Sequence, residues 1–436
     1  MSAPGVSAPS SFLNPAQAAR GRTSVKVWII AGLILALGMF LRIHSWKGFH
    51  RAGFDEVLYR SYVDTLSDRG YSAMPELARA YIAEQTKRDG AILPPTRFLY
   101  IAAATTWRNA FHSDTPPVAN LREPGATQRD PALVSLQRVS GLATILTLLV
   151  TAAFARRLAG DRAMLGVLAL MACAPTQIHM SQHGLIDGFF SFWALTAVWL
   201  CWENLQQPDD RRWQLGYAAV LAAMVLTKEN AAFVYIALSG LLGLAKWQHW
   251  GRVSRGLVLS HLGGAMLGGA MLVLLGGGLQ PTLEIYLLLI AKAQAMDYAI
   301  RTGDGPWFRY LVDLLLASPI VLLLAVAAAF QLRRNQHALL YVLAFIALSY
   351  LVMCNVKYGM NLRYANMWDM PLRLLAFTQL GWLAERYTGK TTLILTLSTL
   401  FLCALELHQY QLLFVSYPGY ELVSANLLEA LKILKF

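Results

Sequence analysis

The run KVWIIAGLILALGMFLR, residues 26–42, places fifteen uncharged residues between a lysine and an arginine. A helix of about 20 mostly apolar residues spans a bilayer, and the aliphatic stems of Lys26 and Arg42 can extend a shorter core to the interface. The run therefore predicts a membrane-spanning helix. Similar runs bring the predicted number of spans to eleven, at about residues 138–155, 163–180, 188–203, 213–227, 230–246, 256–278, 310–332, 338–355, 367–385 and 390–411.

The composition of the chain agrees with many lipid-facing helices. Of the 436 residues, 56% are hydrophobic and only 14% are charged, whereas soluble domains carry roughly 25% charged residues. Mean hydropathy is +0.44. These values exclude a disordered chain, a collagen and a small disulfide scaffold, and they argue against a soluble enzyme. The four cysteines show no C-x-x-C spacing and predict neither a disulfide framework nor a zinc site. We predict an all-α polytopic membrane protein.

The charge distribution predicts which loops face the cytoplasm. The 37 basic and 25 acidic residues leave a net charge of +12, which we attribute to cytoplasmic loops that face anionic headgroups, so nucleic acid is not expected as a partner. The apolar segment 92–111 is interrupted by prolines and arginines. If it crossed the membrane, Arg156 and Arg157 would lie outside, against the positive-inside rule. We therefore predict an interfacial or dipping helix there.

This orientation divides the chain into three parts. Residues 1–24 are rich in Ala, Ser and Pro and are predicted to be a disordered cytoplasmic tail. Residues 25–411 form the transmembrane domain, and its long first loop, 43–135, lies outside and carries juxtamembrane helices. Residues 412–436 are expected to be a C-terminal tail on the outer side. Most of the unusual polar residues fall on outer loops.

The seventh predicted span contains a small-residue pattern. Gly264 and Gly268 form a G-x-x-x-G, with further glycines beside them. Small residues at this spacing let two helix backbones approach each other. The pattern predicts close packing of this helix against a neighbour.

The first outer loop opens with GFDEVLYRSY, residues 53–62. Acids in the first turn of a helix, here Asp55 and Glu56, complement the helix dipole and need no other role. An acidic pair at the bilayer surface would also suit a general base or a metal ligand. Apolar residues recur every four positions and predict an amphipathic helix along the membrane surface, with the row Phe54, Leu58, Tyr62 and Leu66.

A second outer cluster is QIHMSQHGLID, residues 177–187. His179, His183 and Asp187 have the i, i+4, i+8 spacing of one helix face. Converging imidazole and carboxylate groups could bind a divalent metal. Interfacial histidines are common, however, and Gly184 weakens any helix here, so the sequence favours a role other than metal binding. Asp187 precedes a span and has no basic residue as its immediate neighbour.

Two further outer loops carry charged candidate residues, each with two possible interpretations. Lys228 lies between two apolar runs, where a cation is costly unless it is paired or binds an anion. Glu229 could be its partner, or a phosphate headgroup could be its ligand. Arg363 could hold a phosphate in its guanidinium fork, with Tyr364 beside it. Plain anchoring at the membrane interface explains Arg363 and Tyr364 equally well.

In their order along the chain, these segments resemble the GT-C glycosyltransferases that use polyprenyl-phosphate sugars. The similarity is to the branch of protein mannosyltransferases and lipid A aminoarabinose transferases, and it extends over roughly residues 26–385. Six segments carry it: Asp55-Glu56 with Tyr59, Pro94-Pro95 with Phe98 and Tyr100, Arg138-Val139-Ser140-Gly141, Ser181 to Asp187, Leu226-Thr227-Lys228, and Arg363-Tyr364.

The chain departs from the family pattern at three positions. Leu93 stands where a basic residue usually precedes the proline pair, with Arg97 as a substitute, and Gln182 and Gly184 replace an arginine and an alanine. These departures bear on the identity of donor and acceptor more than on the reaction class.

The resemblance implies transfer of a hexosyl or pentosyl group from a polyprenyl phosphate to a hydroxyl or amine of a protein, lipid or glycan, with inversion at the anomeric carbon. It implies Asp55 as general base, with Glu56 and Asp187 orienting the acceptor. Lys228 and Arg363 would stabilise the departing phosphate. The remaining expected substrate-binding residues are Tyr59, Arg97, His183 and Tyr364. A divalent metal shared with the donor phosphate stays open, with Asp55, His183 and Asp187 as its candidate ligands.

The main alternative is a transporter or lipid flippase for an anionic substrate. Transporters usually contain internal repeats and place polar residues at the membrane midplane, whereas here the polar residues gather in outer loops and no repeat is visible. A structural membrane subunit would leave Asp55, Lys228 and Arg363 unexplained. By analogy with the family, we expect a multi-pass protein of the bacterial inner membrane whose active site faces the periplasm.

Overall fold

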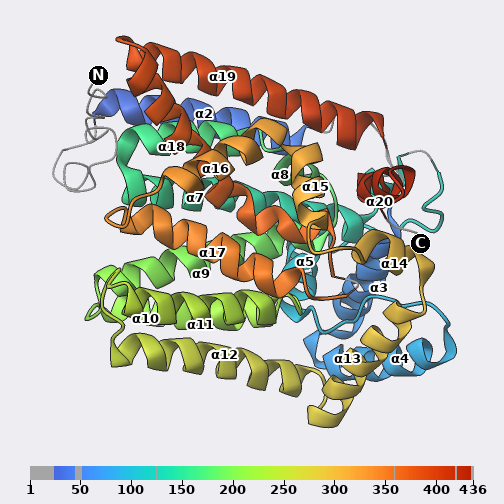
Figure 1. Cartoon of the computed structure of the whole chain (residues 1–436). Helices are drawn as coiled ribbons and strands as arrows, with labels where there is room; N and C mark the ends of the chain where they lie inside the picture. Colours follow the sequence, from blue (N-terminus) through green and yellow to red (C-terminus); the bar gives the residue numbers. More distant parts are fainter. Residues whose placement is uncertain (1–23, 45–51, 124, 358, 418–419, 434–436) are drawn as a thin grey trace.

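The computed structural model describes residues 24–44, 52–123, 125–357, 359–417 and 420–433, and within these ranges the chain forms helices and connecting segments without strands. The predicted all-α fold is confirmed. The predicted disordered tail lies outside the described residues, except Ser24. Long helices run side by side in a bundle (Figure 1): α2 Val25–Ile43, α7 Pro131–Ala172, α9 Ile186–Gln206, α10 Arg211–Val225, α11 Ala231–Trp247, α12 Arg255–Leu275, α16 Pro319–Gln331, α17 His337–Met353, α18 Asp369–Tyr387 and α19 Thr391–Tyr410.

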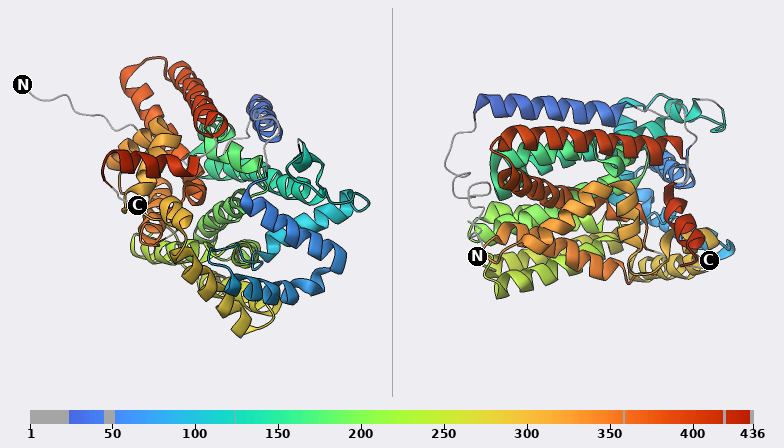
Figure 2. Two further views of the ribbon diagram at one scale, coloured as in Figure 1. Left: turned by 90° about the vertical axis from the view of Figure 1, so that its right-hand side faces the viewer. Right: turned by 45° about the horizontal axis from the view of Figure 1, so that its top comes forward.

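Shorter helices gather at one end of this bundle, on the right in Figure 1 and facing the viewer in the left view of Figure 2. They come from the first loop, from the segment after α12 and from the C-terminal segment: α3 Phe54–Arg69, α4 Met74–Lys87, α5 Phe98–Phe111, α13 Leu279–Gln294, α14 Asp297–Gly303 and α20 Tyr420–Ala430. The other short elements are η1 Tyr71–Ala73, α6 Ala126–Arg129, α8 Pro175–Ser181, α15 Arg309–Ala317, η2 Leu362–Trp368 and the π-helical turn η3 Gln411–Ser416.

Each predicted span coincides with helix, with two corrections. The spans predicted at 138–155 and 163–180 fall on two helices that meet at a sharp kink within the stretch α7, at Gly160, whose φ of 82° is outside the helical region. The latter span ends at Ala172, because Pro175 starts the separate helix α8. The span predicted at 310–332 is broken at Ser318 into α15 and α16.

Within the described residues, four helical segments are long and apolar enough to cross a membrane: Val25–Ile43, Pro131–Ala172, Arg255–Leu275 and Thr391–Ser416. Three shorter apolar helices are Ala231–Trp247, Pro319–Gln331 and His337–Met353. The shorter ones need tilt or extended flanking side chains to complete a crossing. The chain is therefore a multi-pass membrane protein.

The close approach predicted at Gly264 and Gly268 is confirmed. A Cβ at Gly264 would lie 2.5 Å from the carbonyl oxygen of Ala218, and one at Gly268 would lie 2.9 Å from Cα of Ala222. Both alanines belong to α10, so α12 packs with its glycine face on the α10 backbone.

The first outer helix, α3, forms where the sequence predicts it, and Tyr62 and Leu66 of the predicted row are buried, but the buried face is turned away from Phe54 toward Tyr59 and Val63. Phe54 is 56% exposed, whereas Tyr59, Val63 and Leu66 are almost fully buried. The reason is that α5 and α7 pack on the Tyr59 side of α3. This rotation leaves Asp55, which precedes Tyr59 by one turn, facing the centre of the helical end group.

Hydrogen bonds join segments of the first loop to the bundle. The hydroxyls of Tyr100 and Ser140 lie 2.9 Å apart, and Ser140 donates to the carbonyl oxygen of Leu185 at 2.8 Å. The backbone N–H of Leu99 donates to the carbonyl oxygen of Leu226 at 3.0 Å. These bonds hold α5, α7, the start of α9 and the α10–α11 connection together, although they are far apart in sequence.

A buried ionic cluster connects the last helices of the bundle. The Arg373 guanidinium on α18 pairs with Asp369 at 2.7 Å and with Glu406 of α19. Arg373 is fully buried and both acids are nearly so. Buried charges require such pairing, because the desolvation cost of a lone ion is several kcal/mol.

Candidate active site

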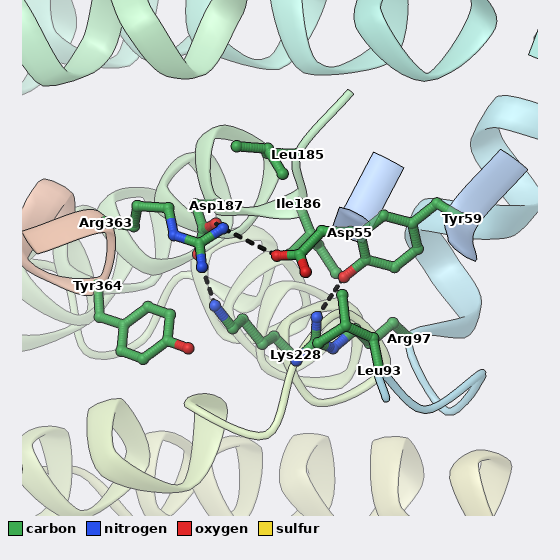
Figure 3. A pocket seen from close by; sticks show the side chains of 10 residues that line it. All are labelled: Asp55, Tyr59, Leu93, Arg97, Leu185, Ile186, Asp187, Lys228, Arg363 and Tyr364. Carbon is green, nitrogen blue, oxygen red and sulfur yellow. Dashed lines mark hydrogen bonds and ion pairs between the residues drawn. The ribbon is translucent and has the colours of Figure 1, made fainter. Parts of the chain in front are cut away.

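A small cavity lies where α3, the start of α9, the α10–α11 connection and η2 meet (Figure 3). Seven of the nine site residues expected from the sequence line it. Its lining is Asp55, Tyr59, Leu93, Arg97, Leu185, Ile186, Asp187, Lys228, Arg363 and Tyr364. We call it the inner cavity. It brings together five segments that the sequence analysis considered separately.

Two cations and two acids form its charged centre. Nζ of Lys228 lies 2.5 Å from Oδ1 of Asp187, and Nη1 of Arg363 lies 3.0 Å from Oδ2 of Asp55. The same Nη1 lies 3.8 Å from Oδ2 of Asp187. The Tyr364 ring lies beneath the Lys228 ammonium, 3.8 Å from ring centroid to Nζ. The simple interpretation of Glu229 as the partner of Lys228 is wrong, because Asp187 takes that place.

Glu229 pairs instead with Arg97, whose Nε donates to Oε2 of Glu229 at 3.3 Å and whose Nη1 donates to the hydroxyl of Tyr59. Burial alone would raise the pKa of Glu229, but the positive charges of Arg97 and Lys228 outweigh burial and lower it. Burial lowers the pKa of Lys228, and Arg97 acts in the same direction, while Asp187 opposes them. Arg97 thus lines the inner cavity, and its role as a substitute for the basic residue missing at Leu93 stays a prediction.

Glu56 lies apart from this charged centre, and its contacts are to the backbone and to a histidine outside the centre. Its carboxylate accepts the backbone N–H of Gly53 at 2.8 Å and of Gly184 at 2.6 Å, and Nδ1 of His183 lies 3.7 Å away. Burial favours the neutral acid, yet the pKa of Glu56 falls to about 2, because the His183 imidazole and these two amides favour the ionised form. Glu56 therefore fastens the start of α3 to the α8–α9 connection.

The predicted helix face of His179, His183 and Asp187 is wrong. Helix α8 ends at Ser181 and α9 begins at Ile186, so the three residues lie on a helix, a turn and a second helix. The turn passes Gly184, where a Cβ would lie 3.1 Å from Leu136 and 3.3 Å from Glu56. The backbone N–H of Gly184 donates to Glu56 at 2.6 Å instead of to a carbonyl of the preceding helical turn, so the helix does not continue through it.

The metal ligands considered from the sequence do not gather into one set. No group of three or more His, Cys, Asp or Glu side chains suited to a metal ion occurs among the described residues. Asp187 is already held by Lys228 and Arg363, while His183 lies beside Glu56. The arrangement of Asp55, His183 and Asp187 thus does not fit a metal site built from those three residues.

A larger cavity of about 860 Å³ adjoins the inner one and is lined by both Glu56 and His183. The two cavities share six lining residues: Asp55, Leu93, Arg97, Leu185, Arg363 and Tyr364. The larger cavity extends along α13, which contributes Tyr286, Leu289, Ile290 and Ala293, and it reaches Met296 just beyond that helix. Its apolar wall ends at the charged centre, which fits a ligand with an apolar body and an anionic head.

Two residues that the sequence analysis missed complete the centre. Glu421 on α20 approaches Arg363, with 2.7 Å between Oε1 and Nε. Asn366 donates from Nδ2 to the carbonyl oxygen of Asp187 at 3.0 Å. The segment 412–436 was expected only as a tail, and an acid in the first turn of a short helix gives no signal of its own. Asn366 follows Arg363-Tyr364 by two residues and could have been considered on that ground.

With this geometry, comparisons with known proteins become informative. The family model of dolichyl-phosphate-mannose-protein mannosyltransferase matches residues 127–275, about a third of the chain. No curated protein matches the sequence. Among solved structures, apo ArnT from Cupriavidus metallidurans is similar at 13% identity and a TM-score of 0.54, with 92% of this chain and 77% of that chain covered.

The chain has the GT-C fold. ArnT bound to undecaprenyl phosphate matches at 16% identity and a TM-score of 0.54, covering 91% of this chain and 67% of that one. The Archaeoglobus fulgidus oligosaccharyltransferase AglB, in complex with an inhibitory peptide and a dolichol-phosphate, matches at 12% identity and a TM-score of 0.52. The match covers 92% of this chain and 56% of that one. These likenesses confirm the resemblance predicted from the sequence. The predicted reaction class, a membrane glycosyltransferase with a lipid-linked donor, agrees with the family match and the GT-C fold.

Proposed function

We propose that the chain moves a hexosyl or pentosyl group from a polyprenyl-phosphate donor to a hydroxyl or amine of an acceptor. The observation that carries the proposal is the meeting of Asp55, Lys228 and Arg363 in one cavity that adjoins the 860 Å³ space. Such a donor has an apolar tail and an anionic head. The apolar wall of α13 suits the tail, and the two cations lie where the head would arrive.

Asp55 is the carboxylate best placed to act as general base. Its side chain is 25% exposed, against 4% for Asp187, and it lines both cavities. A carboxylate in this position can accept a proton from a hydroxyl or amine. Asp55 would remove the proton from the acceptor as the acceptor attacks the anomeric carbon, a contribution of typically about 10²–10⁴-fold in rate.

The leaving group gains negative charge in this step. The bond between the anomeric carbon and the phosphate oxygen breaks, and its electron pair stays on the phosphate. Lys228 and Arg363 would stabilise that charge electrostatically, in a site with little water. Attack from the side opposite the phosphate inverts the anomeric centre.

The remaining polar residues support these roles. In this proposal Asp187 orients Lys228 and Arg363 and can contact the acceptor, while Tyr59 and Arg97 form the wall opposite Tyr364. Glu56 and His183 act indirectly, because Glu56 holds the turn at Gly184 that leads into Asp187. No step requires a metal.

We also propose where the reaction occurs. The positive-inside rule places Arg156 and Arg157 in the cytoplasm and the first loop, 43–135, on the outer side. Figure 1 shows the α7 kink region and the α9–α10 connection at the end of the bundle opposite α3 and α5. The active site would then face the periplasm of a bacterial inner membrane, with loop 43–135 as its catalytic loop.

The test is release of free polyprenyl phosphate by the purified protein from a pool of labelled polyprenyl-phosphate sugars. A native membrane extract supplies protein, lipid and glycan acceptors. Release that depends on the extract, with label appearing on an acceptor, supports the proposal and identifies the product. Movement of intact donor across liposomes without release would contradict it and indicate a transporter.

A further inference from the structure

Arg363 makes an unusual contact with the C-terminal helix. Its Nε lies 2.7 Å from Oε1 of Glu421, within ion-pair distance, yet among the described residues this buried Nε–H has no hydrogen-bond acceptor of suitable geometry. The contact is therefore one of opposite charges without a directed hydrogen bond. Charge-assisted hydrogen bonds are roughly twice as strong as neutral ones, so Arg363 has binding capacity that Glu421 does not use.

The inner cavity has no unpaired cation to offer an incoming phosphate. Among the described residues that line it, Arg97 pairs with Glu229, Lys228 with Asp187, and Arg363 with Asp55 and Glu421. A phosphate that enters beside these carboxylates meets like charges at short range. One carboxylate must give up its cation before the phosphate can bind tightly.

Glu421 is the carboxylate that can give up its cation at the smallest cost in free energy. Asp187 is 4% exposed and tightly bound to Lys228, and Asp55 is needed beside the acceptor. Glu421 keeps three other donors: the Tyr298 hydroxyl on Oε2 and, on Oε1, Nδ2 of Asn361 at 3.2 Å and the Tyr420 hydroxyl at 3.5 Å. Its charge would stay solvated by these groups after Arg363 turned away.

The helix that carries Glu421 is anchored independently of Arg363. Ser424 donates to Asp313 of α15, and Glu429 pairs with Arg301 of α14 at 3.0 Å. Exchange at Arg363 therefore requires only that the guanidinium change partners, while α20 stays in place.

We propose that Glu421 occupies, on Arg363, the position taken by the donor phosphate, so that this residue of the C-terminal helix sets the affinity for the donor. The inference rests on the proposed function, because it deepens the role of Arg363 in holding a lipid phosphate. Glu421 acts as a competing anion and takes no part in bond making.

Binding of undecaprenyl phosphate to the purified full chain tests this without any sugar transfer. Glu421→Gln removes the charge but keeps oxygen and nitrogen atoms for Tyr298 and Asn361. We expect it to bind undecaprenyl phosphate about three- to ten-fold more tightly than wild type, the size of one partly exposed charge interaction. Glu429→Gln, on the same helix but paired with exposed Arg301, is the matched control and should bind as wild type.

A second variant tests the inference independently, in case Glu421→Gln does not fold. Tyr298→Phe leaves Glu421 in place but removes one of its alternative donors, so Glu421 should hold Arg363 more firmly. We expect weaker binding of undecaprenyl phosphate, about two- to five-fold, which is opposite in sign to Glu421→Gln. In transfer assays the donor KM should fall for Glu421→Gln and rise for Tyr298→Phe.

Unchanged or weaker binding by folded Glu421→Gln would overturn the inference, as would equal gains in Glu429→Gln. The proposed function fails differently: the wild type would bind undecaprenyl phosphate, with the expected effect of Glu421→Gln, yet release no polyprenyl phosphate from any sugar donor. The binding and transfer assays therefore separate the two proposals.

Discussion

Lys228 and Asp187, 41 residues apart in sequence, are joined by an ion pair of 2.5 Å between Nζ and Oδ1. The two side chains are only 2% and 4% exposed. A buried charge is stable when it is paired, and removing one partner leaves the other uncompensated. The pair therefore fastens the α10–α11 connection to the start of α9 while it presents a cation to the inner cavity.

Lys228→Met should damage both stability and donor use. Without Lys228, Asp187 still has Arg363 at 3.8 Å but loses its 2.5 Å ion pair, so we expect a loss of about 3–5 kcal/mol in unfolding free energy. The donor KM should rise in any protein that stays folded. Thermal unfolding in detergent and transfer kinetics measure these effects, with Lys228→Arg as the charge-preserving control. A Lys228→Met protein as stable as wild type would show that the pair contributes nothing to the fold.

The pH dependence of stability should depend on Glu56. Its pKa in the folded chain is about 2, below the ordinary value of 4.5. Ionised Glu56 thus contributes stability that is complete above about pH 4.5 and is lost as the pH falls toward 2. Glu56→Gln should be less stable than wild type near neutral pH and should lose less stability on acidification.

The comparison requires unfolding midpoints of both proteins at several values between pH 2 and 6. Glu76→Gln, which changes an exposed acid of α4, is the matched control and should follow the wild-type curve. Parallel curves for wild type and Glu56→Gln would contradict the assigned role.

Much of this arrangement could be predicted from the sequence, since it depends on local patterns. Apolar runs located the helices, and motif order brought Asp55, Asp187, Lys228 and Arg363 into consideration. The partners could not be predicted, because pairing depends on which helix ends meet in space. Lys228 has an acid beside it in sequence, yet its partner is Asp187, since the backbone of the connection directs Glu229 toward Arg97.

The role of the C-terminal segment could not be predicted from the sequence either. Glu421 is 58 residues beyond Arg363 in the chain, and nothing in its immediate sequence marks it as a site residue. It reaches Arg363 and the larger cavity because α20 packs on α14 and α15. Gly184 indicated a break between α8 and α9. The spacing of His179, His183 and Asp187, however, also fitted a continuous helix.

Close packing between α10 and α12 gives a stability prediction. Gly264→Ala would place a methyl group 2.5 Å from the carbonyl oxygen of Ala218 and force the helices apart, at a cost of about 1–3 kcal/mol. Gly263→Ala provides a neighbouring control, because nothing lies within 4 Å of a Cβ there. Thermal unfolding of the two variants should differ clearly. Equal midpoints would contradict the proposed helix contact.

The buried cluster of α18 and α19 should matter for folding and not for donor binding. Glu406→Ala leaves the Arg373 guanidinium with Asp369 as its remaining acid partner, and we expect reduced thermal stability and yield. In the fraction that folds, undecaprenyl phosphate should bind as in wild type. A selective loss of that binding, without loss of stability, would instead connect this cluster to the site.

The most direct test of the central claim uses Asp55→Asn, which keeps the size of the side chain but removes its ability to act as a base. We expect kcat for release of polyprenyl phosphate to fall by about 10²–10⁴-fold. The thermal unfolding midpoint should stay close to that of wild type, and the Kd for undecaprenyl phosphate should stay within a few-fold of the wild-type value. An Asp55→Asn protein that releases polyprenyl phosphate at the wild-type rate would contradict the assignment of Asp55 as general base.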